Sequence, residues 1–161
     1  MAKVSILGVD RLTQRFNNVA NMELRSAMNE AVKLVHAQAK ALAPVSEAGG
    51  NLAGSIHMKV KDTGKELQGR VYTNCEYAAY VEFGTGVTGN GTYPYKVEGL
   101  TLTYRDKGWA YFDDDKGEWI YTKGQEAQPY MYPALKEHEQ TIKKYFRDGV
   151  KTKLKENSKG G

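Results

Sequence analysis

The longest periodic stretch of the chain lies near its N-terminus and predicts an amphipathic helix. Asp10 is suited to cap the start of this helix, and Pro44 disfavours helical geometry at the residue before it. A break or bend is expected near Asn17-Asn18 or Asn21. Apolar residues recur at steps of three and four, as they do on one side of a helix: Met22, Met28, Ala31, Val32, Val35, Ala39 and Leu42. This helix is the longest element that the sequence predicts.

A small β-hairpin is expected to follow. Apolar and polar residues alternate through Ile56, Met58 and Val60, which is typical of a half-buried strand. A turn around residues 62–64 leads into a return strand over residues 67–73, in which Gly69 could form a bulge.

The next segments predict a short helix and an extended β excursion. Residues 77–83 favour a helix with Tyr77 and Tyr80 on its inner side, and Gly84 ends it. The excursion covers residues 87–126. After a loop at Gly89-Asn90-Gly91, Leu100, Leu102 and Tyr104 alternate as in a strand.

Two aromatic runs within the excursion predict a second hairpin. Trp109-Ala-Tyr-Phe112 and Glu118-Trp-Ile-Tyr121 flank the polar segment Asp113–Gly117. A five-residue polar turn that ends in glycine favours such a hairpin.

The C-terminal part predicts a second long helix, from Met131 to about Leu154. Pro129 and Pro133 fix φ at its entry. Its buried side is expected to hold Leu135, Ile142, Tyr145, Phe146 and Val150.

Together these elements predict an α+β fold: a long N-terminal helix, a small antiparallel sheet with an extended β-hairpin, and a long C-terminal helix. The 161 residues are enough for one domain with a core. We therefore expect a single domain over residues 1–155, with the excursion at about 87–126, and a flexible tail over residues 156–161.

Composition and charge bear on the cellular compartment of the protein and on its binding partners. The lone Cys75 cannot form an intrachain disulfide, which favours a reducing compartment, and no apolar run approaches the roughly 18 residues of a membrane span. A soluble intracellular protein without a membrane partner is expected. Residues 136–161 hold eight Lys/Arg and four Asp/Glu, so they account for the whole net charge of +4. This segment could contact DNA or an acidic partner through Lys143, Lys144, Arg147 and Lys151, or it could be a solvated helix.

No pattern in the sequence assembles a catalytic, metal or cofactor site. None of the three histidines is tied by spacing to Cys75 and an orienting acid, and Glu76 and Glu82 are too far out of phase on a helix to act as a pair. Asp113–Asp115 with Glu118 lacks the spacing of a calcium loop, and Gly84–Gly89 lacks the lysine of a phosphate-binding loop. A carboxylate that accepts hydrogen bonds from loop amides is the favoured role for Glu82. The sequence therefore predicts a protein that is not an enzyme and that needs no cofactor.

Three segments in order resemble the lambdoid-phage gene product ten family of tailed-phage tail-completion or head–tail joining proteins. They are Ala39–Ile56, Tyr77-Ala-Ala-Tyr-Val-Glu-Phe-Gly-Thr-Gly86 and Gln128-Pro-Tyr-Met-Tyr-Pro-Ala-Leu135. The resemblance spans roughly Val32 to Tyr145. The chain departs from the family in Pro129-Tyr130, where Pro-Phe is usual, in Ser46–Gly50, and in the length of the segment between the second and third motifs.

The resemblance implies a structural subunit of a virion. Such a subunit would form a ring, expected to be a hexamer, at the virion neck, after synthesis in the host cytoplasm. Its partners would be copies of itself, the head connector or stopper, and the tail terminator or tail tube proteins, with genomic DNA in the lumen as a further candidate.

Two groups of residues carry this interpretation. A rigid structural motif is expected from Glu82, Gly84, Thr85, Gly86, Pro129, Tyr130 and Pro133. A subunit or partner interface is expected from residues of types that concentrate binding energy: Trp109, Tyr111, Phe112, Trp119 and Tyr121. These rings could equally pack on their own domain, a DNA-binding accessory module remains the alternative function, and a hydrolase that uses Glu82 is a third hypothesis.

Overall fold

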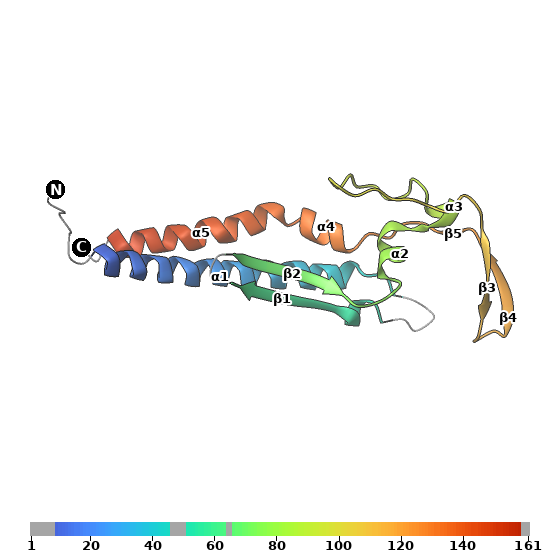
Figure 1. The fold of residues 1–161 in the computed structure, drawn as a ribbon, viewed down its shortest axis with the longest axis horizontal. Helices are drawn as coiled ribbons and strands as arrows, with labels where there is room; N and C mark the ends of the chain where they lie inside the picture. The colour runs from blue at the N-terminus through green and yellow to red at the C-terminus, as the bar shows by residue number, and fades with distance from the viewer. Residues whose placement is uncertain (1–8, 46–50, 64–65, 159–161) are drawn as a thin grey trace, which may run out of the picture. The chain divides into compact units, whose positions relative to one another are not determined.

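The computed structural model describes residues 9–45, 51–63 and 66–158 (Figure 1). Its elements in chain order are α1 (Val9–Leu42), the 3-10 helix η1 (Ala53–Ser55), β1 (Ile56–Asp62), β2 (Leu67–Thr73), α2 (Ala78–Phe83), α3 (Gly86–Gly89), β3 (Trp109–Asp113), β4 (Glu118–Thr122), β5 (Gly124–Gln125), α4 (Met131–Lys136) and α5 (Glu139–Ser158). Strands β1 and β2 form one two-stranded sheet and β3 and β4 another. The predicted α+β class is confirmed.

The described residues divide into two compact units. The first unit takes its residues from Met1–Val35, Met58–Val71 and Glu137–Gly161, and the second from His36–His57 and Tyr72–Lys136. Helix α1 and strands β1 and β2 each contribute residues to both. A single domain over residues 1–155 therefore stays a prediction. Helix α5 includes residues 156–158 of the predicted tail, and 159–161 lie outside the described residues.

The first unit packs α5 and the β1–β2 hairpin on α1 (Figure 1). Its core on α1 consists of Ala27, Ala31, Val32 and Val35. Helix α1 begins at Val9, so Asp10 lies within its first turn, and it continues without a break through Asn17 and Asn21. The expected N-cap is therefore wrong, and so is a break at these residues, while a bend there stays a prediction.

Two predicted members of the α1 stripe do not belong to its buried side. Met22 is 69% exposed, because it lies nine residues before Ala31 and is therefore half a turn out of phase at about 100° per residue. Leu42 is exposed at the end of the helix, while Ala43, one residue further, is buried.

Gly69 lets strand β2 approach helix α1. A Cβ at this position would lie 2.4 Å from Val32 Cγ2 and 2.5 Å from Met28 Sδ. The strand is uninterrupted from Leu67 to Thr73, so Gly69 serves close packing rather than a bulge. On β1, Ile56 is buried but Met58 is exposed, so the predicted alternation does not bury both residues.

The second unit has a core of alanine, leucine and isoleucine side chains around one tyrosine. These are Ala39, Ala43, Leu52, Ile56, Ala78, Tyr130 and Ala134. His36 from α1 is held to it by a hydrogen bond between Nε2 and the Ile56 carbonyl, 2.9 Å long.

The segment before the second hairpin forms no strand, although Leu100, Leu102 and Tyr104 alternate. Residues 90–108 contain neither helix nor strand, because no neighbouring strand offers them a ladder of hydrogen bonds. The Tyr104 hydroxyl instead donates to the Phe83 carbonyl over 2.9 Å. The predicted strand is therefore wrong.

The aromatic hairpin is confirmed. Strands β3 and β4 pair in antiparallel register from Trp109 opposite Thr122 to Asp113 opposite Glu118. Gly117 adopts φ 68° at the end of the turn, and its N–H donates to the Asp113 carbonyl over 2.7 Å.

The predicted C-terminal helix is divided. Helix α4 ends at Lys136 and α5 begins at Glu139, although neither Glu137 nor His138 is a helix-breaking residue. The division falls where the chain passes from the second unit to the first, so tertiary structure sets it. Leu135 is exposed because α4 buries Pro133 and Ala134 instead.

Candidate functional site: an aromatic hairpin on a glycine platform

The second unit is built around the carboxylate of Glu82, which is 5% exposed. One oxygen accepts hydrogen bonds from the N–H groups of Tyr130 and Met131, at 2.8 and 2.9 Å, and the other accepts from Tyr132 at 3.1 Å. These are the free amides at the start of α4. The carboxylate thus caps α4 although it lies 48 to 50 residues away in the chain. Its negative charge also interacts favourably with the positive end of the helix dipole. From the sequence, we expected it to bind amides of a neighbouring turn.

The prolines complete this cap. A helix leaves its first four N–H groups without intrahelical partners, and Glu82 takes three of those around the start of α4. The next residue is Pro133, which has no N–H to satisfy. Pro129 precedes Tyr130 directly, and the N–H of Gln128 donates to the Val81 carbonyl over 2.8 Å. From Gln128 to Pro133, every backbone N–H group therefore donates to a residue of α2, and the two prolines have no N–H group.

Helix α2 places Glu82 inward and its tyrosines outward. Ala78 and Glu82, four residues apart, form the buried side of this short helix. Tyr80 is 58% exposed and Tyr77 is also exposed, so the predicted inward position of both rings is wrong. A hydrogen bond with Cys75 raises the pKa of Tyr77 above its usual value.

The glycines after α2 allow two backbone segments to touch. A Cβ at Gly84 would lie 2.8 Å from the Ala127 nitrogen, one at Gly86 would lie 2.4 Å from the Lys123 carbonyl oxygen, and one at Gly89 would lie 2.7 Å from the Gln125 carbonyl oxygen. Gly84 and Gly86 also have positive φ, at 76° and 62°. We call the segment Gly84–Gly89 the glycine platform.

Hydrogen bonds fasten the return segment of the excursion to this platform. Thr85 and Gly86 form antiparallel bridges with Gln125 and Gly124, and the Gln125 N–H donates to Thr85 Oγ1 over 3.2 Å. The N–H of Thr88 donates to the Lys123 carbonyl over 3.1 Å. The two ends of the excursion therefore meet at the platform, and the backbone groups of the platform are used for packing.

Trp109 anchors the hairpin to the platform. A Cβ at Gly86 would meet the Trp109 ring at 2.8 Å, and the guanidinium of Arg105 lies 5.4 Å from the centre of the same ring. Trp109 is half-buried as a result. This ring, predicted as part of an interface, packs within its own unit.

The other four predicted interface residues divide between the two faces of the hairpin. Residues directly opposite in an antiparallel pair share a face, and the register places Phe112 opposite Trp119. Ala110 and Tyr121 are also opposite and on the same face as that pair. We call these four residues the free face. Tyr111 lies on the other face, with Trp109.

The free face is open to solvent and aromatic. Trp119 is 72% exposed, Tyr121 65% and Phe112 46%. Phe112 and Trp119 meet edge to face, with ring centres 5.7 Å apart. Three large, exposed aromatic side chains on one short hairpin form the kind of patch that marks an interaction surface.

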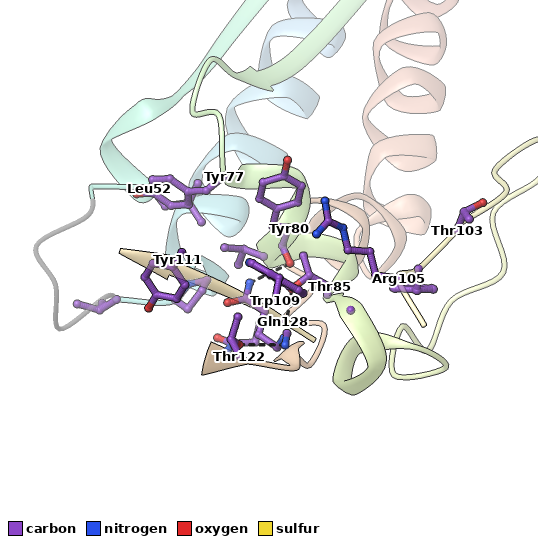
Figure 2. Close-up of a pocket in the computed structure, with 18 residues that line it drawn as sticks. Leu52, Tyr77, Tyr80, Thr85, Thr103, Arg105, Trp109, Tyr111, Thr122 and Gln128 are labelled. Carbon is purple, nitrogen blue, oxygen red and sulfur yellow. Dashed lines mark hydrogen bonds between the residues drawn. The ribbon is translucent and has the colours of Figure 1, made fainter. Parts of the chain in front are cut away.

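A cavity of about 830 Å³ lies on the other side of the hairpin within the same unit (Figure 2). Tyr77, Tyr80, Trp109 and Tyr111 contribute rings to it, and Arg105 is its charged residue. Its described lining contains no Asp, Glu, His or Cys. It therefore offers stacking and hydrogen bonding, but no general base or metal ligand from these side chains.

The titratable residues considered from the sequence are dispersed. The rings of His57 and Tyr72 are tilted against each other with centres 5.8 Å apart, and the Nε2 atom of His138 is buried without a hydrogen-bond partner among the described residues. Among residues 9–45, 51–63 and 66–158, no group of three or more His, Cys, Asp or Glu side chains could hold a metal ion. Asp113 instead organises the hairpin turn, where its Oδ1 accepts from the N–H groups of Asp115 and Lys116.

The predicted basic contacts lie on α5, in the first unit. Lys144, Arg147 and Lys151 are exposed, and none of them forms an ion pair or side-chain hydrogen bond with a described residue. They are three and four residues apart, so they share one side of the helix. Lys143 differs from them, because it pairs with Glu139. Val150, which was expected to be buried, is exposed near this side.

Sequence analysis missed an aromatic cluster behind the Glu82 cap. The rings of Phe83, Tyr93, Tyr95 and Tyr132 follow one another with centres 4.8 to 5.6 Å apart. Burial, followed by the charge of Glu82, raises the pKa of Tyr93 to about 12. The density of tyrosines in the chain was the available signal, but it does not say which rings meet.

One known protein family matches the N-terminal part of the chain. Residues 9–84 match the HK97-gp10-like family, described as "Bacteriophage HK97-gp10, putative tail-component". The matched segment includes α1, the first hairpin and α2, and it ends at Gly84. Over these residues, just under half of the chain, it is similar to this family, whose description points to a structural protein related to the phage tail. No curated protein and no solved structure matches it.

A tail component is part of the virion and contacts other virion proteins. Within the described part of the chain, no helix has both the length and the apolar character needed to cross a bilayer.

Proposed function

We propose that the chain is a tail-completion or head–tail joining subunit at the neck of a tailed phage of the siphovirus type. Several copies, expected to be six, form a ring there between the head connector or stopper and the tail terminator or tail tube. The subunit has no enzymatic activity. It is made in the host cytoplasm and needs no cofactor.

The family match carries this proposal, and the free face of the hairpin supports it. A ring subunit needs adhesive surfaces, and exposed tryptophan and tyrosine side chains supply binding energy at low cost in conformational entropy. Both carboxylate oxygens of Glu82 accept hydrogen bonds from backbone N–H groups. This supports a structural role for Glu82 rather than a catalytic one.

A phage that lacks the gene tests the proposal. Infected cells should accumulate unjoined heads and tails, visible by electron microscopy, and wild-type protein supplied in trans should restore infectious particles. Normal virions from the deletion phage would contradict the assignment. Labelling of the protein away from the neck in intact particles would contradict the proposed location.

A second candidate is a DNA-binding accessory module, favoured by Lys144, Arg147 and Lys151 on α5, which pair with no residue that the structure describes. Contacts to three phosphates would give a slope of about −3 for log K against log salt on duplex DNA. Truncation after Arg147 should flatten that slope, because it removes Lys151 and the end of the helix. DNA binding of a Lys144→Glu/Arg147→Glu variant can be compared with that of Lys59→Glu/Lys61→Glu. The second variant changes the net charge equally, at two exposed positions on β1.

A further inference from the structure

The hairpin carries an acidic tip next to its free face. Asp114, Asp115 and Glu118 are exposed, and none of their carboxylates pairs with a described residue. The fourth acid of the turn, Asp113, forms an ion pair with Lys116, with 3.5 Å between Asp113 Oδ2 and Lys116 Nζ. The turn therefore presents the charges of Asp114 and Asp115, neither paired with a described residue, next to the three exposed rings, while Glu118 lies opposite Asp113 on the other face of the hairpin.

Helix α5 presents the complementary surface. Lys144, Arg147 and Lys151 are three uncompensated positive charges on its solvent side, with Asp148 as the one acid near them. They extend over about 10 Å at 1.5 Å per residue, which is the scale of a hairpin tip. The exposed Val150 and the aliphatic stems of the cations add apolar surface.

We propose that the free face and acidic tip of one copy dock on the basic side of α5 of a second copy. The charges attract, and the aromatic rings of Phe112, Trp119 and Tyr121 can lie against the cations, which favour the face of such rings. The inference rests on the proposed ring, because it supplies the contact between its subunits.

The contact is heterologous, since the hairpin of one copy meets a different surface of the next. Each chain then carries one donor and one acceptor surface, and repeated head-to-tail docking closes into a ring if the rotation between copies allows it. The same surface of α5 was the candidate DNA contact, so the two uses of these cations compete.

Charge exchange between two purified full-length chains tests the proposal. Variant one reverses the tip, Asp114→Lys/Asp115→Lys, and leaves Asp113 and Gly117 of the turn unchanged. Variant two reverses the helix, Lys144→Glu/Arg147→Glu. Self-association is measured by sedimentation equilibrium up to millimolar concentration at 0.1 M salt.

Each variant alone should associate about tenfold or more weakly than the wild type, because like charges then face each other. An equimolar mixture should recover the wild-type association, since both mixed contacts pair opposite charges. Salt at 1 M, where the screening length is about 3 Å, should weaken the wild-type contact. Matched controls are Glu98→Lys/Asp106→Lys for the tip and Lys59→Glu/Lys61→Glu for the helix, all at exposed positions. Both should associate as the wild type does.

Several outcomes would overturn the inference. These are a wild type that stays monomeric throughout, variants that associate normally, or variants whose mixture shows no recovery. Loss of DNA binding by variant two with unchanged self-association would assign α5 to nucleic acid. Loss of virion incorporation with unchanged self-association would assign the hairpin to another tail protein. Since the assay uses purified chain, its failure leaves the neck assignment to be judged by the deletion phage.

Discussion

Glu82 joins two segments that lie 48 residues apart in the chain. It is buried and charged, and such a group is tolerated only when hydrogen bonds replace its hydration. Three backbone amides at the start of α4 do so, and Pro133 follows them. One side chain therefore both orients a helix and avoids an unpaired buried charge.

Replacement of Glu82 should weaken folding without changing any exposed surface. Glu82→Gln keeps the shape of the side chain but removes its charge. Its NH2 group would also face backbone N–H groups, which cannot accept a hydrogen bond. We therefore expect a loss of about 2 kcal/mol in the free energy of unfolding. Urea denaturation measures it. Glu76→Gln, on an exposed neighbour without a described partner, should change stability by less than about 0.5 kcal/mol. Equal effects of the two changes would contradict the capping role.

Two tyrosines near Glu82 should titrate late. Burial, followed by the charge of Glu82, raises the pKa of both Tyr93 and Tyr130 to about 12 from a usual value of 10.0. The folded chain then holds more protons than the unfolded chain above pH 10. These residues stabilise the fold fully below that pH, and their contribution is lost as pH rises toward 12. Ultraviolet titration of the phenolates should resolve a late-ionising group of tyrosines, and a uniform transition near pH 10 would contradict this.

At the scale of elements, the glycine platform fixes the position of the segment that follows the hairpin. Helix α2 ends at Gly84, and the platform lies so close to residues 123–127 that a side chain at Gly84, Gly86 or Gly89 would collide with backbone atoms. Backbone approaches of this kind need glycine because any Cβ would occupy the space of the partner chain. The motif that resembles a phosphate-binding loop is used here for packing.

Alanine substitutions can separate backbone conformation from close packing. Gly86→Ala combines a φ of 62° with a Cβ only 2.4 Å from the Lys123 oxygen. Gly91→Ala has a similar φ of 78° but no atom within 4 Å. We expect a loss of about 1 kcal/mol for Gly91→Ala and about 3 kcal/mol or more for Gly86→Ala, measured by denaturant unfolding. Equal losses would show that the approach of the two segments is not required.

At the scale of the whole molecule, the residues predicted for contact differ in what they do. Trp109 stabilises the second unit from within, while Phe112, Trp119 and Tyr121 contribute exposed surface. The basic residues of α5 belong to the other unit. We therefore expect folding and the proposed assembly to be separable properties of this chain.

Removal of exposed rings should block assembly and leave folding intact. Trp119→Ser/Tyr121→Ser should change the free energy of unfolding by less than about 1 kcal/mol, since both rings are mostly exposed. Complementation of a deletion phage with this variant should yield at least tenfold fewer infectious particles. Trp109→Ser is the contrasting control, because it should lower stability itself. Normal complementation by the double variant would remove the free face from the assembly model.

The sequence by itself determined the local elements whose signals are strong. Helical periodicity with Pro44 gave the long helix, the run from Trp109 to Tyr121 gave the hairpin, and Gly84 gave the end of α2. In each case, neighbours within a few residues supply the deciding interaction, so the pattern is visible in one dimension. The family resemblance also depended on such local motifs, and residues 9–84 confirm it.

Tertiary structure alone decided which side of each element is used. It turned Tyr80 outward, placed Glu82 under a helix about 50 residues away, and divided the C-terminal helix at residues 137–138. It also separated Trp109 from the rings of the free face. The physical reason is that burial and long-range hydrogen bonds depend on which segments meet, and that information is absent from the local periodicity of a single element.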